Sequence, residues 1–163
     1  MGLLPSGSAA SRVALLLAFA VPAALLGGAY VGQYVFGLWP CEMCWWQRYA
    51  HFAALAFAGL ALVRPPAELL VRLAALAILI GGLIGAYHAG VEYGWWKGFT
   101  ACTSEVAFSG DPLNDILKAP MVRCDQVQWE MFGISLAGFN FLISVPAALL
   151  VFVLLGRGKE TAS

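Results

Sequence analysis

The sequence predicts an all-α membrane protein, a four-transmembrane-helix bundle with a long loop between its third and fourth helices. Of its 163 residues, 61% are hydrophobic and 11% are charged, and the mean hydropathy is +0.81. A soluble domain needs a much larger charged fraction to cover its surface. The apolar residues also form four blocks, each near the roughly 20 residues that a bilayer core requires. We therefore expect residues 1–163 to form a single membrane domain.

The four predicted spans are residues 13–36, 45–63, 69–88 and 132–155. The first block follows Arg12, as in a signal peptide, but it is long for that role and ends in aromatic residues typical of a retained helix at a membrane interface. The second block ends at Pro65 and Pro66, because proline cannot continue the helical hydrogen bonds. Small residues predict close helix packing in the third and first spans (Gly81, Gly82 and Gly85; Gly27 and Gly28).

Positive charges predict the orientation of the bundle. They gather at both termini and in the connection between the second and third spans (Arg12, Arg64, Arg72, Arg157 and Lys159). By the positive-inside rule both termini are then cytoplasmic, and the loop over residues 89–131 faces the periplasm. Within this loop Asp111 and Pro112 predict a capped short helix over residues 111–117. The formal net charge is zero, and nothing else indicates a nucleic-acid partner.

All four cysteines fall on the predicted periplasmic side, where disulfides form and persist. Cys41 and Cys44 follow Pro40 at the start of the second span. The amide groups and partial positive charge of a helix start favour a thiolate, so this Cys-x-x-Cys pair is predicted to be redox-active. Cys102 and Cys124 are separated by 21 residues, a spacing that suits a loop-closing disulfide.

Two other roles would use the same four cysteines. A structural zinc site usually needs a second close pair or histidine ligands, and the oxidising compartment opposes free thiols, so we expect no metal. Two purely structural disulfides are the stronger alternative. However, a bridge between Cys41 and Cys44 closes so short a loop that it would stabilise the chain little.

Four polar residues near the cysteines are candidate binding residues. Arg48 and His51 extend the helix face of Cys44, where a cation would stabilise a thiolate. His88 ends the third span on the same membrane side, and Gln47 precedes Arg48. Polar groups inside a span are costly and often functional. The alternatives are that Arg48 snorkels to the lipid headgroups and that the other three are interfacial hydrogen-bonding residues.

Three strings of the sequence resemble the DsbB (disulfide bond formation protein B) family. The first is Cys41-Glu42-Met43-Cys44-Trp45-Trp46-Gln47-Arg48, which is similar to the family's Cys-x-x-Cys-x-x-Gln-Arg signature. The others are His88-Ala89-Gly90-Val91-Glu92 before Gly94-Trp95-Trp96, and Cys124-Asp125 leading to Gln128-Trp129 and Phe132-Gly133. The resemblance covers nearly the whole chain.

The resemblance implies a thiol:quinone oxidoreductase of the bacterial inner membrane. It would reoxidise a periplasmic thioredoxin-fold dithiol oxidase of the DsbA type and pass the electrons to a membrane quinone, ubiquinone in the first instance or menaquinone. The partner's thiolate would attack Cys102 of a Cys102–Cys124 disulfide. Cys124 would then attack Cys41, and Cys44 would face a quinone bound by Arg48, His88, Gln47 and His51.

Two rival functions predict different features. An enzyme similar to vitamin K epoxide reductase would carry its Cys-x-x-Cys in a later helix, whereas here the second span carries it. A non-catalytic, disulfide-stapled membrane scaffold would have bridges that do not respond to quinone, and it would leave Arg48 unexplained.

Overall fold

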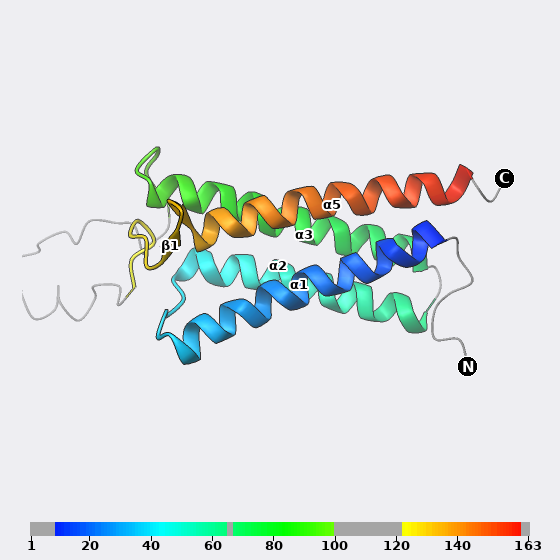
Figure 1. Cartoon of the computed structure of the whole chain (residues 1–163), viewed down its shortest axis with the longest axis horizontal. Coiled ribbons are helices and arrows are strands. Elements are labelled where there is room, and N and C mark those ends of the chain that lie inside the picture. Colours follow the sequence, from blue (N-terminus) through cyan, green and yellow to red (C-terminus); the bar gives the residue numbers. More distant parts are fainter. Residues whose placement is uncertain (1–8, 65–66, 100–121, 161–163) are drawn as a thin grey trace, which may run out of the picture.

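The computed structural model describes residues 9–64, 67–99 and 122–160 and contains four long helices, which run along a common direction (Figure 1). They are α1 (Ala9–Val35), α2 (Glu42–Val63), α3 (Ala67–Glu92) and α5 (Leu136–Glu160). Three of them, Ala9–Val35, Ala67–Glu92 and Leu136–Arg157, are long and apolar enough to cross a membrane. Helix α2 has 22 residues but is not among them. Its N-terminal half carries Gln47, Arg48 and His51, which lower its hydropathy.

On the side of the cysteines, the turns after α1 and α3 each contain a glycine with a positive φ, Gly37 and Gly94. At the end of α3 the Trp95 amide donates to the Gly90 carbonyl (2.8 Å) and the Gly94 amide to the Val91 carbonyl (3.1 Å). Gly94 has a φ of +70°. This is a Schellman motif, which needs a left-handed residue after the helix. It stops α3 just after Glu92 and turns the chain back over the bundle.

A short hairpin precedes α5, which the sequence did not lead us to expect. Strands β1 (Glu130–Met131) and β2 (Ile134–Ser135) pair antiparallel through the two-residue turn Phe132-Gly133. Both turn residues have positive φ, 54° and 74°, as a type I′ turn requires. The predicted fourth span began at residue 132, whereas the helix begins at Leu136 because the turn backbone is not helical. The predicted short helix over residues 111–117 lies outside the described residues.

Small residues line the contacts between helices. A Cβ at Gly82 would lie 2.8 Å from the Ser144 Cβ, and one at Gly85 would lie 2.9 Å from the Ala137 carbonyl oxygen. The predicted close packing of α3 is therefore confirmed. The same prediction for α1 is wrong, because a Cβ at Gly27 or Gly28 would meet nothing within 4 Å.

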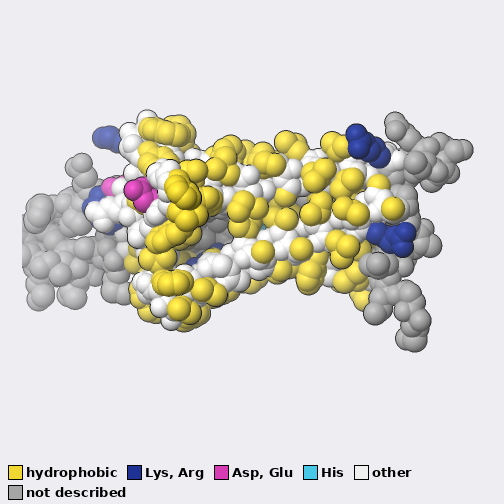
Figure 2. All heavy atoms as spheres, viewed as in Figure 1, with side chains coloured by type: hydrophobic (Ala, Val, Ile, Leu, Met, Phe, Trp, Pro, Cys, Tyr) yellow, Lys and Arg dark blue, Asp and Glu magenta, His cyan; other side chains and the backbone are white. Residues whose placement is uncertain are grey.

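Large apolar side chains point outward along the helices, whereas the core between them is rich in alanine. Figure 2 shows hydrophobic side chains over the length of the bundle and charged side chains at its two ends. This distribution suits lipid outside and close helix packing inside. Helix α1 begins and α5 ends at the same end of the bundle, where α2 also meets α3, and the hairpin lies at the other end (Figure 1).

Candidate functional site

Cys41 and Cys44 are two free thiols whose sulfur atoms lie 3.0 Å apart. Cys41 is the N-cap of α2, and its sulfur accepts a hydrogen bond from the backbone amide of Cys44 (3.3 Å). Pro40 keeps the chain extended before this cap. The sulfur atoms are about 1 Å farther apart than in a disulfide bond, which is about 2.05 Å long. A small side-chain movement therefore suffices to close or open this bridge.

The Cys44 thiol and the helix start both favour a negative charge on Cys41. A hydrogen bond from the Cys44 thiol lowers the pKa of the Cys41 thiol below its ordinary value, and the backbone amides of Cys44 and Met43 add to this effect. Burial and the nearby Glu92 carboxyl act in the opposite direction without overcoming it. In the reduced pair, Cys41 is thus the sulfur prepared to carry the negative charge.

The segment before the hairpin brings a third cysteine to this pair. Cys124 is fully buried and disulfide-bonded. Its sulfur, the Cys41 sulfur and a ring nitrogen of His88 all lie within 4.8 Å of one another. Such donors suit a soft metal, but the Cys124 sulfur is already bonded to another sulfur. The same closeness places Cys124 within reach of Cys41 for thiol–disulfide exchange. Cys102, the remaining predicted site cysteine, lies outside the described residues.

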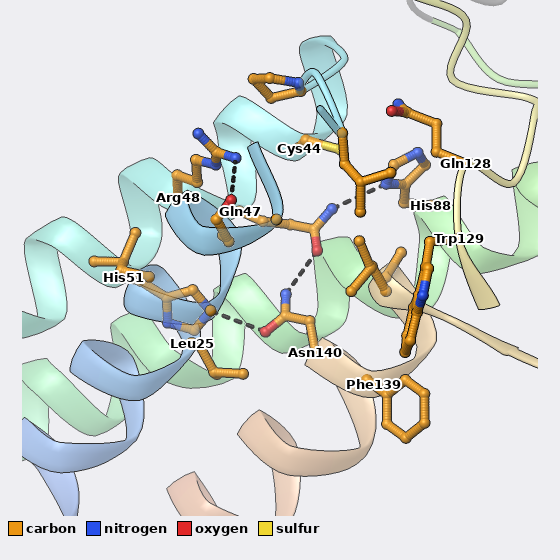
Figure 3. Close-up of a pocket in the computed structure, with 18 of the residues that line it drawn as sticks. Leu25, Cys44, Gln47, Arg48, His51, His88, Gln128, Trp129, Phe139 and Asn140 are labelled. Atoms are coloured by element: carbon orange, nitrogen blue, oxygen red, sulfur yellow. Dashed lines mark hydrogen bonds between the residues drawn. The ribbon is translucent and has the colours of Figure 1, made fainter. Parts of the chain in front are cut away.

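A cavity of about 220 Å³ lies below the thiol pair, between α1, α2, α3 and α5 (Figure 3). Its walls are mostly apolar, and Cys44 and all four predicted binding residues, Gln47, Arg48, His51 and His88, line it. An engineered cavity of about 150 Å³ holds benzene, so this cavity can hold one substituted ring. The structure thus brings the predicted binding residues together in the wall of one cavity.

The Arg48 side chain is buried and directed toward α1. Its Nη1 donates to the Gln33 Oε1 (2.6 Å) and its Nη2 to the Ala29 carbonyl (3.2 Å). The guanidinium carbon lies 5.0 Å from the Tyr30 ring centre and 5.1 Å from that of Trp45. Arg48 is only 6% exposed, which does not fit snorkelling to the headgroups. The described contacts also do not join it to the Cys44 sulfur, so the expected direct support of a Cys44 thiolate is not seen.

The two histidines and Gln47 are joined by a residue that we did not predict. Asn140 of α5 donates from its amide nitrogen to the Gln47 Oε1 (2.7 Å), and its Oδ1 lies 2.9 Å from the His51 Nε2 (Figure 3). The Gln47 Nε2 in turn lies 3.0 Å from the His88 Nδ1, and the His88 Nε2 lies 3.5 Å from the Cys41 sulfur. A buried polar network thus runs between His51 and Cys41.

Three further polar residues of the site were missed by the sequence reasoning. Asn140 and Gln33 are polar residues inside predicted spans, and that rare feature could have identified them. Glu92 was assigned to the loop after residue 88, but α3 continues through it. One turn beyond His88, its side chain is 8% exposed and its Oε1 lies 3.8 Å from the His88 Nε2.

Comparison with known proteins gives a consistent result. The family model for disulfide bond formation protein DsbB matches residues 11–154. Three relatives named disulfide bond formation protein B come from Polaromonas sp. (32% identical, covering 90% of both chains), Verminephrobacter eiseniae (33%, covering 93% of this chain and 89% of the relative) and Acidovorax sp. (32%, covering 95% and 92%). No solved structure gave a significant match. With its paired thiols at a helix start beside a mostly apolar cavity, the chain belongs to the disulfide bond formation protein DsbB family of membrane thiol:quinone oxidoreductases.

Proposed function

We propose that this chain reoxidises a periplasmic thioredoxin-fold dithiol oxidase of the DsbA type and delivers the electrons to a membrane quinone, ubiquinone in the first instance and menaquinone as the alternative. The position of the Cys41 sulfur carries the proposal. It lies within 4.8 Å of the Cys124 sulfur on one side and 3.0 Å from the Cys44 sulfur on the other. Cys44 lines the cavity, so the three sulfurs lead from the periplasmic segment toward a ligand site.

The proposal includes α2 as a fourth membrane span. With 22 residues it is about 33 Å long, enough for the hydrocarbon core of about 30 Å. The residues that lower its hydropathy, Gln47, Arg48 and His51, are all buried inside the bundle and do not meet lipid. We place both termini in the cytoplasm and the cysteines on the periplasmic side of the inner membrane. Arg12, Arg64, Arg72 and Arg157 support this, because they belong to the helix ends remote from the thiol pair.

The proposed exchange begins with the loop disulfide. A thiolate of the partner attacks Cys102 of the Cys102–Cys124 disulfide, which forms a bond between the partner and Cys102 and releases Cys124 as a thiolate. Cys124 then attacks Cys41 of an oxidised Cys41–Cys44 pair, and Cys44 leaves as a thiolate. In each step one disulfide bond forms and one breaks, and the displaced sulfur leaves as a thiolate.

The second half of the exchange restores the loop disulfide. The partner's other thiolate attacks its bond to Cys102, so the partner leaves oxidised and Cys102 leaves as a thiolate. Cys102 then attacks Cys124 of the Cys41–Cys124 bond and displaces Cys41. The two electrons of the partner now reside on Cys41 and Cys44. The displaced Cys41 thiolate is stabilised by the Cys44 amide and thiol, which makes Cys41 a good leaving group.

The cavity fits a quinone headgroup. When bound, a quinone would accept the two electrons released as the reduced pair becomes a disulfide, together with one proton from the Cys44 thiol and one from solvent. Among the described residues the His51 Nδ1 is buried without a hydrogen-bond partner, so it can bind a polar group of a ligand. Arg48 uses two of its five N–H donors on Gln33 and Ala29. The apolar wall, with Leu25, Leu26 and Phe139, excludes water from the thiols.

The test uses purified protein, a reduced thioredoxin-fold partner and a soluble ubiquinone analogue whose absorbance reports its reduction. We expect loss of quinone absorbance with the wild type and none with Cys44→Ser. In Cys44→Ser we also expect a Cys41–Cys124 disulfide in non-reducing peptide maps, because these sulfurs are neighbours.

A scaffold held by inert disulfides gives the opposite result. The wild type would then leave the quinone unreduced, both bridges would resist the partner, and Cys44→Ser would show no new disulfide. The control variant is Arg72→Met, at an exposed position remote from the thiol pair; it should reduce quinone like the wild type.

A further inference from the structure

Two side-chain amides connect the two histidines of the site, and these are the only histidines in the chain. The order of the chain of contacts is His51, Asn140, Gln47, His88, Cys41, with distances of 2.9, 2.7, 3.0 and 3.5 Å. The residues come from α2, α3 and α5, and all of them are less than 9% exposed. Since a buried polar group without a partner is costly, the direction of each hydrogen bond matters.

Backbone carbonyls determine how both amides are oriented. The Gln47 Nε2 lies 3.2 Å from the Met43 carbonyl oxygen, and the Asn140 Nδ2 lies 3.0 Å from the Gly81 carbonyl oxygen. A carbonyl oxygen only accepts, so each contact requires the amide nitrogen at that position. The Asn140 Oδ1 is left to accept, and it receives a hydrogen bond from the Ser144 hydroxyl (2.8 Å). Each amide therefore has one orientation in this site.

The amide orientations decide which ring nitrogen of each histidine carries the proton. The Gln47 Nε2 donates to the His88 Nδ1, so that nitrogen is unprotonated and the proton sits on Nε2, which faces the Cys41 sulfur. The Asn140 Oδ1 accepts from His51, so His51 also carries its proton on Nε2. Its Nδ1 then has a free lone pair in the cavity wall.

Two glycines of α3 leave space for this arrangement. A Cβ at Gly85 would lie 3.0 Å from the Asn140 Nδ2, and one at Gly81 would lie 3.2 Å from the His51 Nε2. The close approach of α3 to α5 and α2 thus allows the polar chain to form inside the bundle.

We propose that Asn140 is a positioning residue that acts through Gln47 on His88, holding both histidines with the proton on Nε2. His88 then directs an N–H toward the Cys41 sulfur, where it stabilises a thiolate, and His51 offers an acceptor to the cavity. The consequence for turnover rests on the proposed function, whereas the protonation pattern does not. Asn140 itself contacts neither Cys41 nor His88, so any effect on His88 must pass through Gln47.

The test is NMR of protein labelled with ¹⁵N in the histidine rings, purified in detergent micelles, with a His88→Gln variant to assign the two ring systems. Two-bond proton–nitrogen couplings distinguish a proton on Nε2 from one on Nδ1. We expect Nε2–H for both histidines in the wild type. In Asn140→Asp a carboxylate oxygen replaces the donor that faces the Gln47 Oε1. We expect the repulsion between these oxygens to outweigh the contact of Gln47 with the Met43 carbonyl, so that Gln47 turns its oxygen toward His88 and a Nδ1–H signal of His88 appears. His51 keeps its Nε2 proton, because a carboxylate still accepts it.

The control variant is Ser144→Ala, which also removes a hydrogen bond to Asn140 but leaves its amide nitrogen in place; both histidines should keep the wild-type pattern. A Nδ1–H signal for His88 in the wild type overturns the proposal, even if Asn140→Asp fails to fold. An unchanged His88 in folded Asn140→Asp overturns it too. We further expect kcat for quinone reduction to fall by about tenfold in Asn140→Asp, the size of one lost hydrogen bond to a charged group. An unchanged kcat beside an active wild type refutes the positioning role alone, whereas an inactive wild type refutes the proposed function.

Discussion

Replacing Arg48 with methionine should weaken quinone binding and should lower the free energy of unfolding by a similar amount. The two hydrogen bonds of the guanidinium, to Gln33 and Ala29, contribute about 1.5–3 kcal/mol each, and each of its two ring contacts about 2 kcal/mol, because Arg48 is buried. Burying a cation that has no carboxylate partner among the described residues costs several kcal/mol. Methionine removes both the gain and the cost and fills similar space.

In Arg48→Met the main remaining cost to the free energy of unfolding is the buried Gln33 Oε1, because this acceptor loses its hydrogen-bond donor. An unpaired buried acceptor costs about 1–3 kcal/mol, and we expect a destabilisation of that size. A ligand loses a charge-assisted hydrogen bond from one of the unused N–H groups, worth about 1.5–3 kcal/mol, so Kd should rise roughly tenfold to a hundredfold.

Thermal unfolding in detergent micelles measures the first quantity, and quenching of tryptophan fluorescence by a soluble ubiquinone analogue measures Kd, since Trp129 lines the cavity. Arg72→Met is the matched control. Its ion pair with Glu68 (2.8 Å) is solvent-exposed, so stability should change by less than about 1 kcal/mol and Kd should not change. An unchanged Kd in Arg48→Met would remove Arg48 from the ligand site. A destabilisation far above 3 kcal/mol would mean that Arg48 serves the fold.

The other predictions concern helix packing, the thiol pair and the hairpin. Gly85→Ala should lower the free energy of unfolding by about 1–3 kcal/mol because its Cβ would meet backbone atoms of α5, whereas Gly59→Ala, with nothing within 4 Å, should leave it unchanged or raise it; equal effects would refute this packing. The lowered pKa of Cys41 means that its thiolate persists below pH 9.0 and is lost only as pH falls through the lowered value. The midpoint of the thiolate absorbance of the reduced protein should therefore lie below pH 9.0, and a midpoint at or above that pH would contradict the hydrogen bonding described. Tyr93→Phe removes the hydroxyl that accepts from the Ser135 amide (2.7 Å) and donates to the Gly133 carbonyl (3.0 Å), and exchange of the Ser135 amide should quicken by about tenfold; unchanged exchange would mean that the hairpin does not depend on this hydroxyl.

Composition and local motifs were sufficient for the membrane class, the long helices and the position of the two thiols at a helix start. Long apolar blocks form helices in a membrane because only helical hydrogen bonds satisfy the backbone there. Cys41 and Cys44 could be placed at a helix start because Pro40 and the Cys-x-x-Cys spacing act within a few residues. The candidate residues Gln47, Arg48, His51 and His88 could be selected because polar side chains are rare within spans.

The sequence did not predict the turn before α5 or the residue at which α3 ends. Hydropathy does not report a two-residue turn, so the hairpin at Phe132 and Gly133 was counted as part of an apolar block. Glu92 was taken for a loop residue because its charge ended the apolar run, although the helix continues to it.

Only the tertiary structure decided what each polar group touches. Arg48 and Cys44 share a helix face, yet the guanidinium donates to the Gln33 side chain and the Ala29 carbonyl of α1. Asn140 meets Gln47 across 93 residues of sequence, and Cys124 reaches Cys41 from the segment before the hairpin. Local patterns determine which segments become helices and which residues are costly to bury. The direction of a buried hydrogen bond depends on which helices lie side by side, and that is set by the packing of small residues across the whole bundle.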